Sequence, residues 1–252
     1  MKVIIVAAGL GSRLGNITKE TPKGLVNING KSILERQIFL FKKYGVSDIT
    51  VIIGPYSEKY SFRNVSYIQD TKYIEHDLLS SLMLARSIMI DDVIISYGDI
   101  IFDDVIIKSI INFKGDVGLA VDMNWEKKYR GQPKNIIDKI SNVLITNDFV
   151  AKIGYNMQFR NYGGGLGEFI GLMKLSKKSS NLLVRKYLEL EKSHIGTFHD
   201  SNSLKDGILT DMLQELIDSN VNVTPVKIDG KWCEIDTPQD LKRAREMFKS
   251  DY

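Results

Sequence analysis

The order of apolar and polar positions divides the first half of the chain into short strands and amphipathic helices. Continuous apolar runs bounded by turn residues, typical of buried strands, occur at 2–9, 48–54, 65–70, 91–100 and 117–123. Apolar residues with helical spacing occur at 32–45, 77–89 and 103–113. Because strands alternate with helices, we expect an α/β fold with a doubly wound, mostly parallel sheet.

The pattern changes from about residue 134. Candidate strands joined by short polar turns, which predict a small antiparallel excursion, occupy 142–148, 149–156 and 167–176. The chain continues with two helices, two strands and a final helix at 179–193, 206–219, 222–228, 231–236 and 238–249. We interpret residues 1–252 as a single domain in which 124–166 is an insertion or lid over the substrate site.

Short-range signals mark two of the helix boundaries. Ser32 and Glu35 have the spacing of a capping box, and Gly45 is suited to end the helix that they begin. Near the C-terminus, Thr237 is a plausible N-cap and Pro238 stands where a proline is favoured in the first helical turn.

Composition narrows the class of protein. The 34 basic and 31 acidic residues give a net charge of only +3, which provides no sign of a nucleic-acid-binding surface. The single cysteine, Cys233, excludes an internal disulfide framework and fits a reducing compartment. The first apolar run is short for a signal peptide, and no apolar stretch approaches the roughly 18 residues of a membrane span. We therefore expect a cytoplasmic globular protein.

Glycines follow the first strand in the segment AAGLGSRLG, at Gly9, Gly11 and Gly15. A dinucleotide-binding turn would open directly into a helix, but residues 16–30 have no helical apolar period. The second strand closes on Gly54 and Pro55 rather than on the acidic residue that binds a ribose. A P-loop at 30–32 would require a glycine where Leu25 stands. Neither of these two nucleotide-binding motifs fits.

What remains at this turn is a set of groups suited to a polyphosphate. Ser12 and Arg13 lie among the glycines, and the long loop that follows carries Lys19 and Lys23. Several backbone N–H groups together with two or three cations form a cradle for a triphosphate.

The segment AAGLGSRLGNITKETPKGL (7–25) resembles the signature of the nucleotidyltransferases that make nucleotide sugars and CDP-activated small molecules. Further matches, which extend the resemblance over essentially the whole chain, are YGDI, GEFIGL and EIDTPQDL, at 97–100, 167–172 and 234–241. The chain departs from the family at Gly15, near which many members have a proline. The C-terminal half is similar to small cytidylyltransferases acting on phosphocholine and 2-aminoethylphosphonate. The resemblance implies a Rossmann-like, GT-A-like sheet.

The resemblance also implies a reaction of the EC 2.7.7 type. A phosphate or phosphonate oxygen attacks the α-phosphorus of a nucleoside triphosphate and expels diphosphate. Since the attacking oxygen is already an anion, the enzyme supplies position and positive charge rather than a general base. By the family's motif, Arg13 with the backbone around Gly11 holds the leaving phosphates, and Lys23 bridges the α-phosphate and the acceptor. Asp99 and Asp236, each at the end of a predicted strand, are the expected Mg²⁺ ligands.

The same resemblance places the nucleotide against the first strand and the helix predicted at 77–89. The expected nucleotide-binding residues are Ala7, Ala8, Gly9, Gly11, Ser12, Arg13, Asp77 and Ser81. Asp77 is equally explained as the cap of that helix. A preference for CTP over UTP or dTTP rests on the resemblance alone.

The acceptor site is expected between the strand ends and the insertion. Its candidate residues are Lys23, Asp122, Trp125, Arg130, Glu168 and Glu234. Trp125 beside carboxylates would suit an ammonium head group, although it is equally explained as a packing residue. Glu234 shares a strand face with Asp236, because residues two apart point the same way. Arg130 and Arg160 could instead hold the carboxylate of an amino-acid phosphate such as phosphoglutamine.

Together these features predict a Mg²⁺-dependent cytidylyltransferase of small phosphorylated or phosphonate metabolites, serving capsule or other surface-polysaccharide assembly or phosphonate assembly. One alternative is a sugar-1-phosphate nucleotidyltransferase that uses UTP or dTTP. The other is a non-catalytic nucleotide-binding regulatory subunit, which the presence of both cations and both aspartates disfavours.

Overall fold

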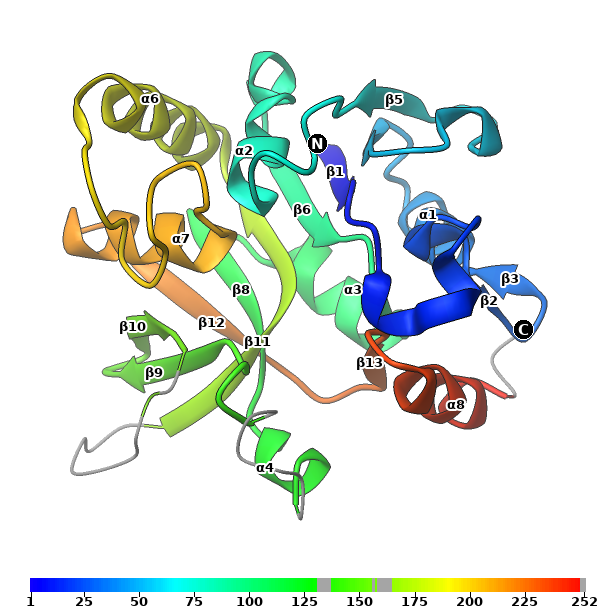
Figure 1. Ribbon diagram of the computed structural model, residues 1–252. Coiled ribbons are helices and arrows are strands. Elements are labelled where there is room, and N and C mark those ends of the chain that lie inside the picture. The colour runs from blue at the N-terminus through cyan, green and yellow to red at the C-terminus, as the bar shows by residue number, and fades with distance from the viewer. Residues whose placement is uncertain (131–136, 156, 158–164, 250–252) are drawn as a thin grey trace.

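A buried strand at the N-terminus organises the sheet. β1 (Lys2–Ala7) pairs in parallel with β4 (Ile49–Ile53) on one side and with β6 (Val93–Tyr97) on the other (Figure 1). β5 (Ser66–Gln69) extends the sheet beyond β4. The computed structural model describes residues 1–130, 137–155, 157 and 165–249.

The other half of the sheet is mixed. The long strand β11 (Gly165–Leu175) runs antiparallel to β6, to β8 (Val117–Asp122) and to β9 (Asn142–Thr146). β10 (Phe149–Gly154) pairs antiparallel with β9, and β12 (Val223–Ile228) pairs in parallel with β8. The sheet order is β10-β9-β11-β6-β1-β4-β5, and β8 and β12 branch from β11. The predicted α/β fold with an antiparallel excursion is confirmed.

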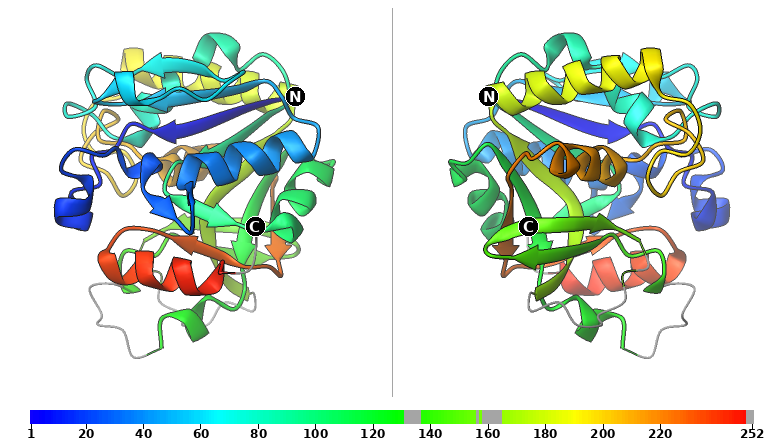
Figure 2. Two further views of the ribbon diagram at one scale, coloured as in Figure 1. Left: turned by 90° about the vertical axis from the view of Figure 1, so that its right-hand side faces the viewer. Right: turned by 90° about the vertical axis from the view of Figure 1, so that its left-hand side faces the viewer.

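Helices cover both faces of the sheet (Figure 2). One face carries α1 (Ile33–Lys43) and α3 (Asp104–Asn112), and the other carries α2 (Leu78–Met83), α6 (Lys177–Ser193) and α7 (Leu209–Asp218). The two resulting cores account for the uninterrupted apolar runs, since a strand covered on both faces buries every side chain.

The side chains of β1 show this division directly. Val3 and Ile5 belong to the core beneath α1 and α3, whereas Ile4 and Val6 belong to the core beneath the other three helices. Successive side chains of a strand point to opposite faces, so one apolar run supplies both cores.

A third apolar cluster joins the two ends of the chain. β13 (Trp232–Glu234) pairs antiparallel with β7 (Ile100–Phe102) outside the main sheet, and α8 (Pro238–Met247) follows it. The cluster combines N-terminal and C-terminal residues, among them Leu14, Ile28, Ile33, Cys233, Leu241 and Phe248. α8 also contacts the hairpin formed by β2 (Asn27–Ile28) and β3 (Lys31–Ser32). This packing holds the N-terminal loop against the segment that follows β13.

The predicted caps are present. The Ser32 hydroxyl accepts a hydrogen bond from the Glu35 backbone N–H, and the Glu35 carboxylate accepts one from the Ser32 N–H. Thr237 caps α8 through its side chain, and Asp103 caps α3. These contacts satisfy backbone N–H groups that the first helical turn leaves unpaired.

Two predicted elements are interrupted. The helix expected over 77–89 consists of α2 and a separate 3₁₀ helix, Arg86–Ile88. The strand expected over 91–100 ends at Tyr97, and β7 begins only at Ile100. Gly98 lies in the turn between β6 and β7. A Cβ atom there would lie 2.4 Å from Cβ of Ala7, so this turn depends on glycine.

The remaining elements are short. They are α4 (Trp125–Lys128) and three 3₁₀ helices, Ser12–Thr18, Lys23–Leu25 and Ser57–Lys59. The first α-helix therefore begins only at Ile33, as the sequence predicted. Of the predicted insertion, the structure describes α4, β9, β10 and the start of β11, and its role as a lid stays a prediction. None of the helices in the described ranges is long and apolar enough to cross a membrane.

Candidate active site

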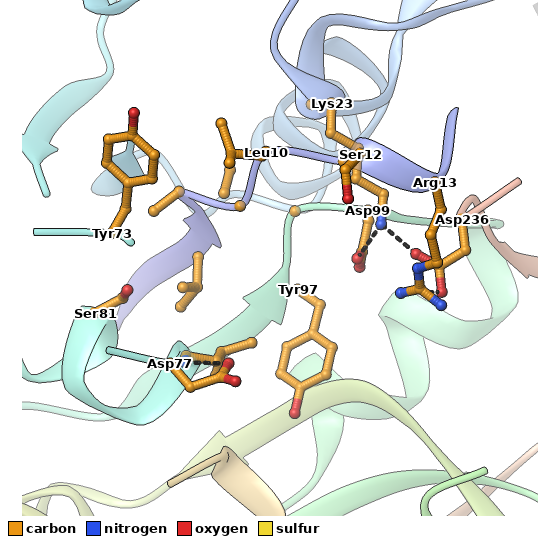
Figure 3. A pocket seen from close by; sticks show the side chains of 18 of the residues that line it. Leu10, Ser12, Arg13, Lys23, Tyr73, Asp77, Ser81, Tyr97, Asp99 and Asp236 are labelled. Atoms are coloured by element: carbon orange, nitrogen blue, oxygen red, sulfur yellow. Dashed lines mark hydrogen bonds and ion pairs between the residues drawn. The ribbon is translucent and has the colours of Figure 1, made fainter. Parts of the chain in front are cut away.

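The glycine turn after β1 forms one wall of a cavity of about 330 Å³ (Figure 3). The other walls come from the end of β6, the loop before α2 and the first turn of α2. The cavity lies at the carboxyl ends of parallel strands, where open α/β sheets bind ligands. The residues lining it include Ala7, Ala8, Gly9, Gly11, Ser12, Arg13, Lys23, Asp77, Ser81, Asp99 and Asp236.

Among the three glycines of this turn, Gly11 is the one at which an added side chain would collide with a neighbouring residue. Its φ of +65° lies in the left-handed region, which favours glycine. A Cβ atom there would lie 2.9 Å from Cβ of Lys23. The Thr18 hydroxyl donates a 2.8 Å hydrogen bond to the Gly11 carbonyl and fixes the turn. The glycine therefore allows the turn to lie directly against the lysine.

Lys23 joins the two aspartates that the sequence selected. It is 9% exposed, and its Nζ lies 2.7 Å from Asp99 Oδ2 and 2.5 Å from Asp236 Oδ1. Burial alone would lower the pKa of Lys23, but the two carboxylates outweigh it and the pKa lies above its ordinary value. Arg13 lies on the outer side, with Nη2 2.8 Å from Asp236 Oδ2. A buried lysine and a partly exposed arginine thus line one end of the cavity.

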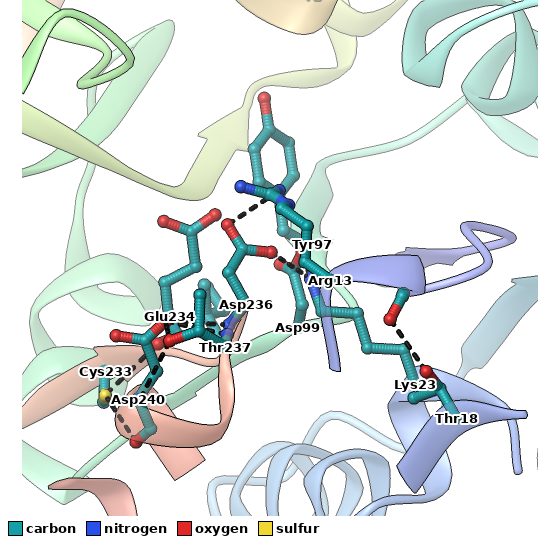
Figure 4. Close-up of polar contacts among 12 residues, drawn as sticks. Arg13, Thr18, Lys23, Tyr97, Asp99, Cys233, Glu234, Asp236, Thr237 and Asp240 are labelled. Carbon is teal, nitrogen blue, oxygen red and sulfur yellow. Dashed lines mark hydrogen bonds and ion pairs between the residues drawn. The ribbon is translucent and has the colours of Figure 1, made fainter. Parts of the chain in front are cut away.

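A third carboxylate, that of Glu234, lies beside the two aspartates. Side-chain oxygens of Asp99, Glu234 and Asp236 all lie within 4.8 Å of one another (Figure 4). Burial, together with the charges of the two aspartates, raises the pKa of Glu234. Burial would also raise the pKa of Asp236, but Lys23 and Arg13 reverse the shift and lower it.

The residues present fit a hard divalent cation. Carboxylate oxygens are the ligands that Mg²⁺ prefers, and Asp99 Oδ1 is buried without a hydrogen-bond partner among the residues that the structure describes. A cation held by Asp99 and Asp236 would supply that oxygen with a partner. Glu234 was selected from the sequence as an acceptor ligand, and the structure places it in this acidic cluster, so its role towards the acceptor stays a prediction.

The opposite end of the cavity has polar but mostly uncharged walls. Tyr73, Asp77 and Ser81 line it, and Tyr97 lies between these residues and Asp99 in Figure 3. The Asp77 carboxylate accepts the Leu78 backbone N–H at 2.7 Å, so this side chain caps α2 as well as lining the cavity. A polyphosphate at the Lys23 end would leave this end for a nucleoside.

Asp70, a buried aspartate that was not selected from the sequence, contacts two residues that line this end of the cavity. Asp70 is 1% exposed and accepts hydrogen bonds from the Ser81 hydroxyl at 2.6 Å and from the Lys72 backbone N–H. Nε2 of His76, which also lines the cavity, lies 2.9 Å from the same carboxylate. The only sequence signal was an acidic residue at the end of the strand predicted over 65–70.

Of the predicted acceptor residues, Lys23 lines this cavity and Glu234 lies beside it in the acidic cluster, whereas the others are not among the residues that line it. Trp125 is 9% exposed and donates its indole N–H to the Leu166 carbonyl at 3.1 Å. Arg130 is exposed, and Arg160 lies outside the described residues. For Trp125, the contacts correspond to the packing alternative that the sequence left open.

Asp122 and Glu168 belong to a second polar group next to Glu234. Asp122 accepts the indole N–H of Trp232 at 2.9 Å. Glu168 is 3% exposed and accepts the Tyr129 hydroxyl at 2.7 Å. Burial raises the pKa of Glu168. Asp122 and Glu168 thus belong to a buried polar group that does not line the cavity containing Lys23, Arg13, Asp99 and Asp236.

Comparison with known proteins relates this geometry to a family. The sequence model of the MobA-like NTP transferase domain matches residues 3–138. The chain is 29% identical to the CTP:phosphoglutamine cytidylyltransferase of Campylobacter jejuni over 255 residues, which cover 96% of this chain and 98% of that protein. It is 35% identical to the choline-phosphate cytidylyltransferase of Streptococcus pneumoniae over 106 residues, or 40% of this chain and 46% of that one.

A solved structure has the same fold. The structure of CTP:phosphocholine cytidylyltransferase from Streptococcus pneumoniae superposes with a TM-score of 0.73 and 21% identity, and the match covers 98% of both chains. At this identity the likeness concerns the fold and not the ligands.

Proposed function

Because the chain belongs to the MobA-like NTP transferase domain family and is a nucleotidyltransferase, we propose that it transfers a cytidylyl group from CTP to a small phosphorylated or phosphonate metabolite. The product would be a CDP- or CMP-linked metabolite, with diphosphate as the leaving group. Support for the nucleotide comes from the full-length similarity to a cytidylyltransferase. Support for the chemistry comes from one observation: Lys23 lies between Asp99 and Asp236 beside a glycine turn.

The chain's own groups suit an attack by an anion. The acceptor oxygen is already ionised at neutral pH, so the reaction requires orientation and charge compensation rather than proton removal. Lys23 can bind the α-phosphate and the acceptor phosphate, and Arg13 with the N–H groups of the turn can hold the β- and γ-phosphates. The Lys23 side chain reaches the cavity in a fixed position because the turn and both aspartates surround it.

Mg²⁺ is the cation that we propose for the acidic cluster. Asp99 and Asp236 would hold it, and when bound it neutralises charge on the triphosphate. Lys23 and Arg13 would then exchange their contacts with the aspartates for contacts with phosphate oxygens.

We assign the nucleoside to the end of the cavity lined by Ala7–Gly9, Asp77 and Ser81. The acceptor would approach from the side of Glu234, beneath the insertion at 124–166. We place the activity in the cytoplasm, in the assembly of a surface polysaccharide or of a phosphonate, because the one cysteine is a buried free thiol and because of the relatives' activities.

A matrix of substrates tests the proposal. Diphosphate release is measured with CTP, UTP, dTTP and ATP, each against phosphocholine, 2-aminoethylphosphonate, phosphoglutamine and glucose 1-phosphate. We expect the highest kcat/KM with CTP and one of the first three acceptors. Faster turnover of UTP or dTTP with the sugar phosphate than of any CTP pair would instead favour a sugar-1-phosphate nucleotidyltransferase, and inactivity with every pair would favour a regulatory subunit.

A further inference from the structure

A lysine of the chain lies over the ring of Trp232, two residues before Glu234 of the acidic cluster. Nζ of Lys128, at the end of α4, lies 3.2 Å from the ring centroid of Trp232 and 5.2 Å from that of Tyr129. Trp232 is 5% exposed, and Asp122 fixes its indole N–H. A cation this close to a tryptophan face makes a favourable cation–π contact. The protein's own ammonium therefore takes the place that an ammonium ligand would need.

Lys128 also lies beside a buried carboxylate without a hydrogen bond to it. Its Nζ is 3.8 Å from Oε2 of Glu168, close enough for attraction between charges but too far for a hydrogen bond. The other Glu168 oxygen accepts the Tyr129 hydroxyl. Both Lys128 Nζ and Glu168 Oε2 are buried, and neither has a hydrogen-bond partner in the described structure. Buried polar groups are rarely left unpaired, so this donor and this acceptor call for a partner.

The pair lies on the acceptor side of the cluster. Trp232 and Glu234 share one face of β13, because residues two apart in a strand point the same way. Asp236 follows two residues after β13 ends, so the segment from Trp232 to Asp236 leads from the ring that Lys128 contacts to a carboxylate that contacts Lys23. An acceptor whose phosphate lies at Lys23 and that extends past Glu234 would reach Lys128 and Glu168, whose polar atoms are buried in this structure and would become accessible when the acceptor binds.

We propose that Lys128 and Glu168 bind the far end of the acceptor, and that this end is an amino-acid or carboxamide group rather than a quaternary ammonium. The inference rests on the proposed function and narrows its acceptor class. Such a group offers an oxygen that accepts from Lys128 and an N–H that donates to Glu168. A quaternary ammonium offers neither, and the positive charge of Lys128 repels it. A primary amine satisfies Glu168 but not Lys128.

Acceptor discrimination tests this proposal. With CTP, the wild-type protein should have a kcat/KM for phosphoglutamine or phosphoserine at least 10-fold above that for phosphocholine, with 2-aminoethylphosphonate between them. Lys128→Met keeps most of the stem but removes the donor. It should raise KM for phosphoglutamine at least 10-fold, leave KM for CTP within 2-fold, and lower or preserve KM for phosphocholine. The exposed neighbour Lys127→Met, the matched control, should change none of these values.

A purely structural lysine would give a different result. Lys128→Met would then weaken all acceptors by the same factor, or lower stability without changing the preference among them, and the proposal would be wrong. If that variant does not fold, Glu168→Gln replaces it, with a selective rise in KM expected for acceptors that carry an N–H. Wild-type preference for phosphocholine with CTP would refute this inference and leave the proposed function standing. An absence of CTP turnover with every acceptor would refute both.

Discussion

At the scale of single residues, Lys23 carries the most specific arrangement in the molecule. Its ammonium is buried, and it contacts carboxylates from two segments, one of them 213 residues away in sequence. A lysine held in this way has little freedom, so its charge is in place before a substrate binds. Preorganised charge of this kind commonly accounts for a large share of catalysis.

We therefore expect Lys23→Ala to lower kcat about 100- to 1,000-fold while the far-ultraviolet circular dichroism spectrum stays unchanged. Diphosphate release measures the rate. Lys152→Ala, an exposed lysine on β10, is the control and should keep wild-type activity. If Lys23→Ala has the wild-type kcat, Lys23 does not have the catalytic role proposed for it.

Asp236 gives the corresponding prediction for the metal. Removal of divalent cations with EDTA should abolish turnover, and Mg²⁺ should restore it. In Asp236→Asn, the Mg²⁺ concentration for half-maximal rate should rise by more than the roughly 10-fold that loss of an outer-sphere partner costs. Asp229→Asn, an exposed residue before β13, should show the wild-type Mg²⁺ dependence. Full activity in EDTA would contradict the assignment.

The resemblance to a family signature was sufficient to single out Arg13, Lys23, Asp99 and Asp236, and the structure brings these four side chains together, while their roles stay predictions. It was not sufficient for Asp70, whose partners come from the loop before α2 and from α2 itself. Lys128 was missed for a similar reason. Its significance depends on Trp232, which is distant in sequence and is brought to it only by the fold.

At the scale of elements, the glycine turn combines two separate requirements. Gly11 has a positive φ, and it also allows Lys23 to approach. Gly45 at the end of α1 has a φ of +80° but nothing within 4 Å of an added Cβ atom. Comparing these two glycines therefore separates the cost of a side chain in a left-handed backbone conformation from the effect of displacing Lys23.

Both Gly11→Ala and Gly45→Ala should lower the free energy of unfolding by about 1–2 kcal/mol, the cost of a left-handed conformation for a residue with a Cβ atom. Only Gly11→Ala should also lower kcat/KM for the triphosphate, because its methyl group displaces Lys23. Chemical denaturation and diphosphate release measure the two effects. If Gly11→Ala and Gly45→Ala have the same kcat/KM, the close approach of Gly11 to Lys23 does not matter for activity.

The contact between α6 and α7 gives a prediction on pH. Glu215 on α7 lies 2.9 Å from Lys186 Nζ on α6 and 3.1 Å from His199 Nε2. Burial would raise the pKa of Glu215, but these two partners lower it below its ordinary value of 4.5. A carboxylate with a lowered pKa stabilises the fold above its ordinary pKa, and this stabilisation is lost as the pH falls through the folded-state value.

Glu215→Gln should therefore lower the free energy of unfolding at pH 7 by up to about 1 kcal/mol, since the group is partly exposed. At pH 3 the difference from the wild-type protein should shrink. Urea denaturation at the two pH values measures it, with the exposed Glu191→Gln as control. If the stability difference between Glu215→Gln and the wild-type protein is larger at pH 3 than at pH 7, the Glu215 carboxylate does not stabilise the fold in the way described.

Most elements could be predicted because buried strands and amphipathic helices have distinct periods. The break after α2 has no such signal, since apolar spacing continues through the 3₁₀ helix that follows. The break after β6 depends on the closeness of Gly98 to Ala7, a contact between strands that no local pattern reports.

At the scale of the whole molecule, the site is assembled from both ends of the chain. The third apolar cluster packs the N-terminal loop against β13 and α8, and this packing, together with the pairing of β13 with β7, brings Asp236 to Lys23. The carboxyl ends of parallel strands lie at one edge of a sheet, and this rule accounts for the position of Asp99 beside the glycine turn. The antiparallel pairing of β13 with β7 lies outside that rule, so the position of Glu234 within the cluster followed from the structure alone.

The central claim concerns a single reaction, and its products test it most directly. The protein is incubated with Mg²⁺, CTP and phosphoglutamine, and the mixture is followed by ³¹P NMR and mass spectrometry. The account predicts one equivalent of diphosphate for each equivalent of CDP-linked product, with no reaction when UTP replaces CTP. Release of inorganic phosphate without a linked product, or a UDP-linked product formed faster than the CDP-linked one, would contradict it.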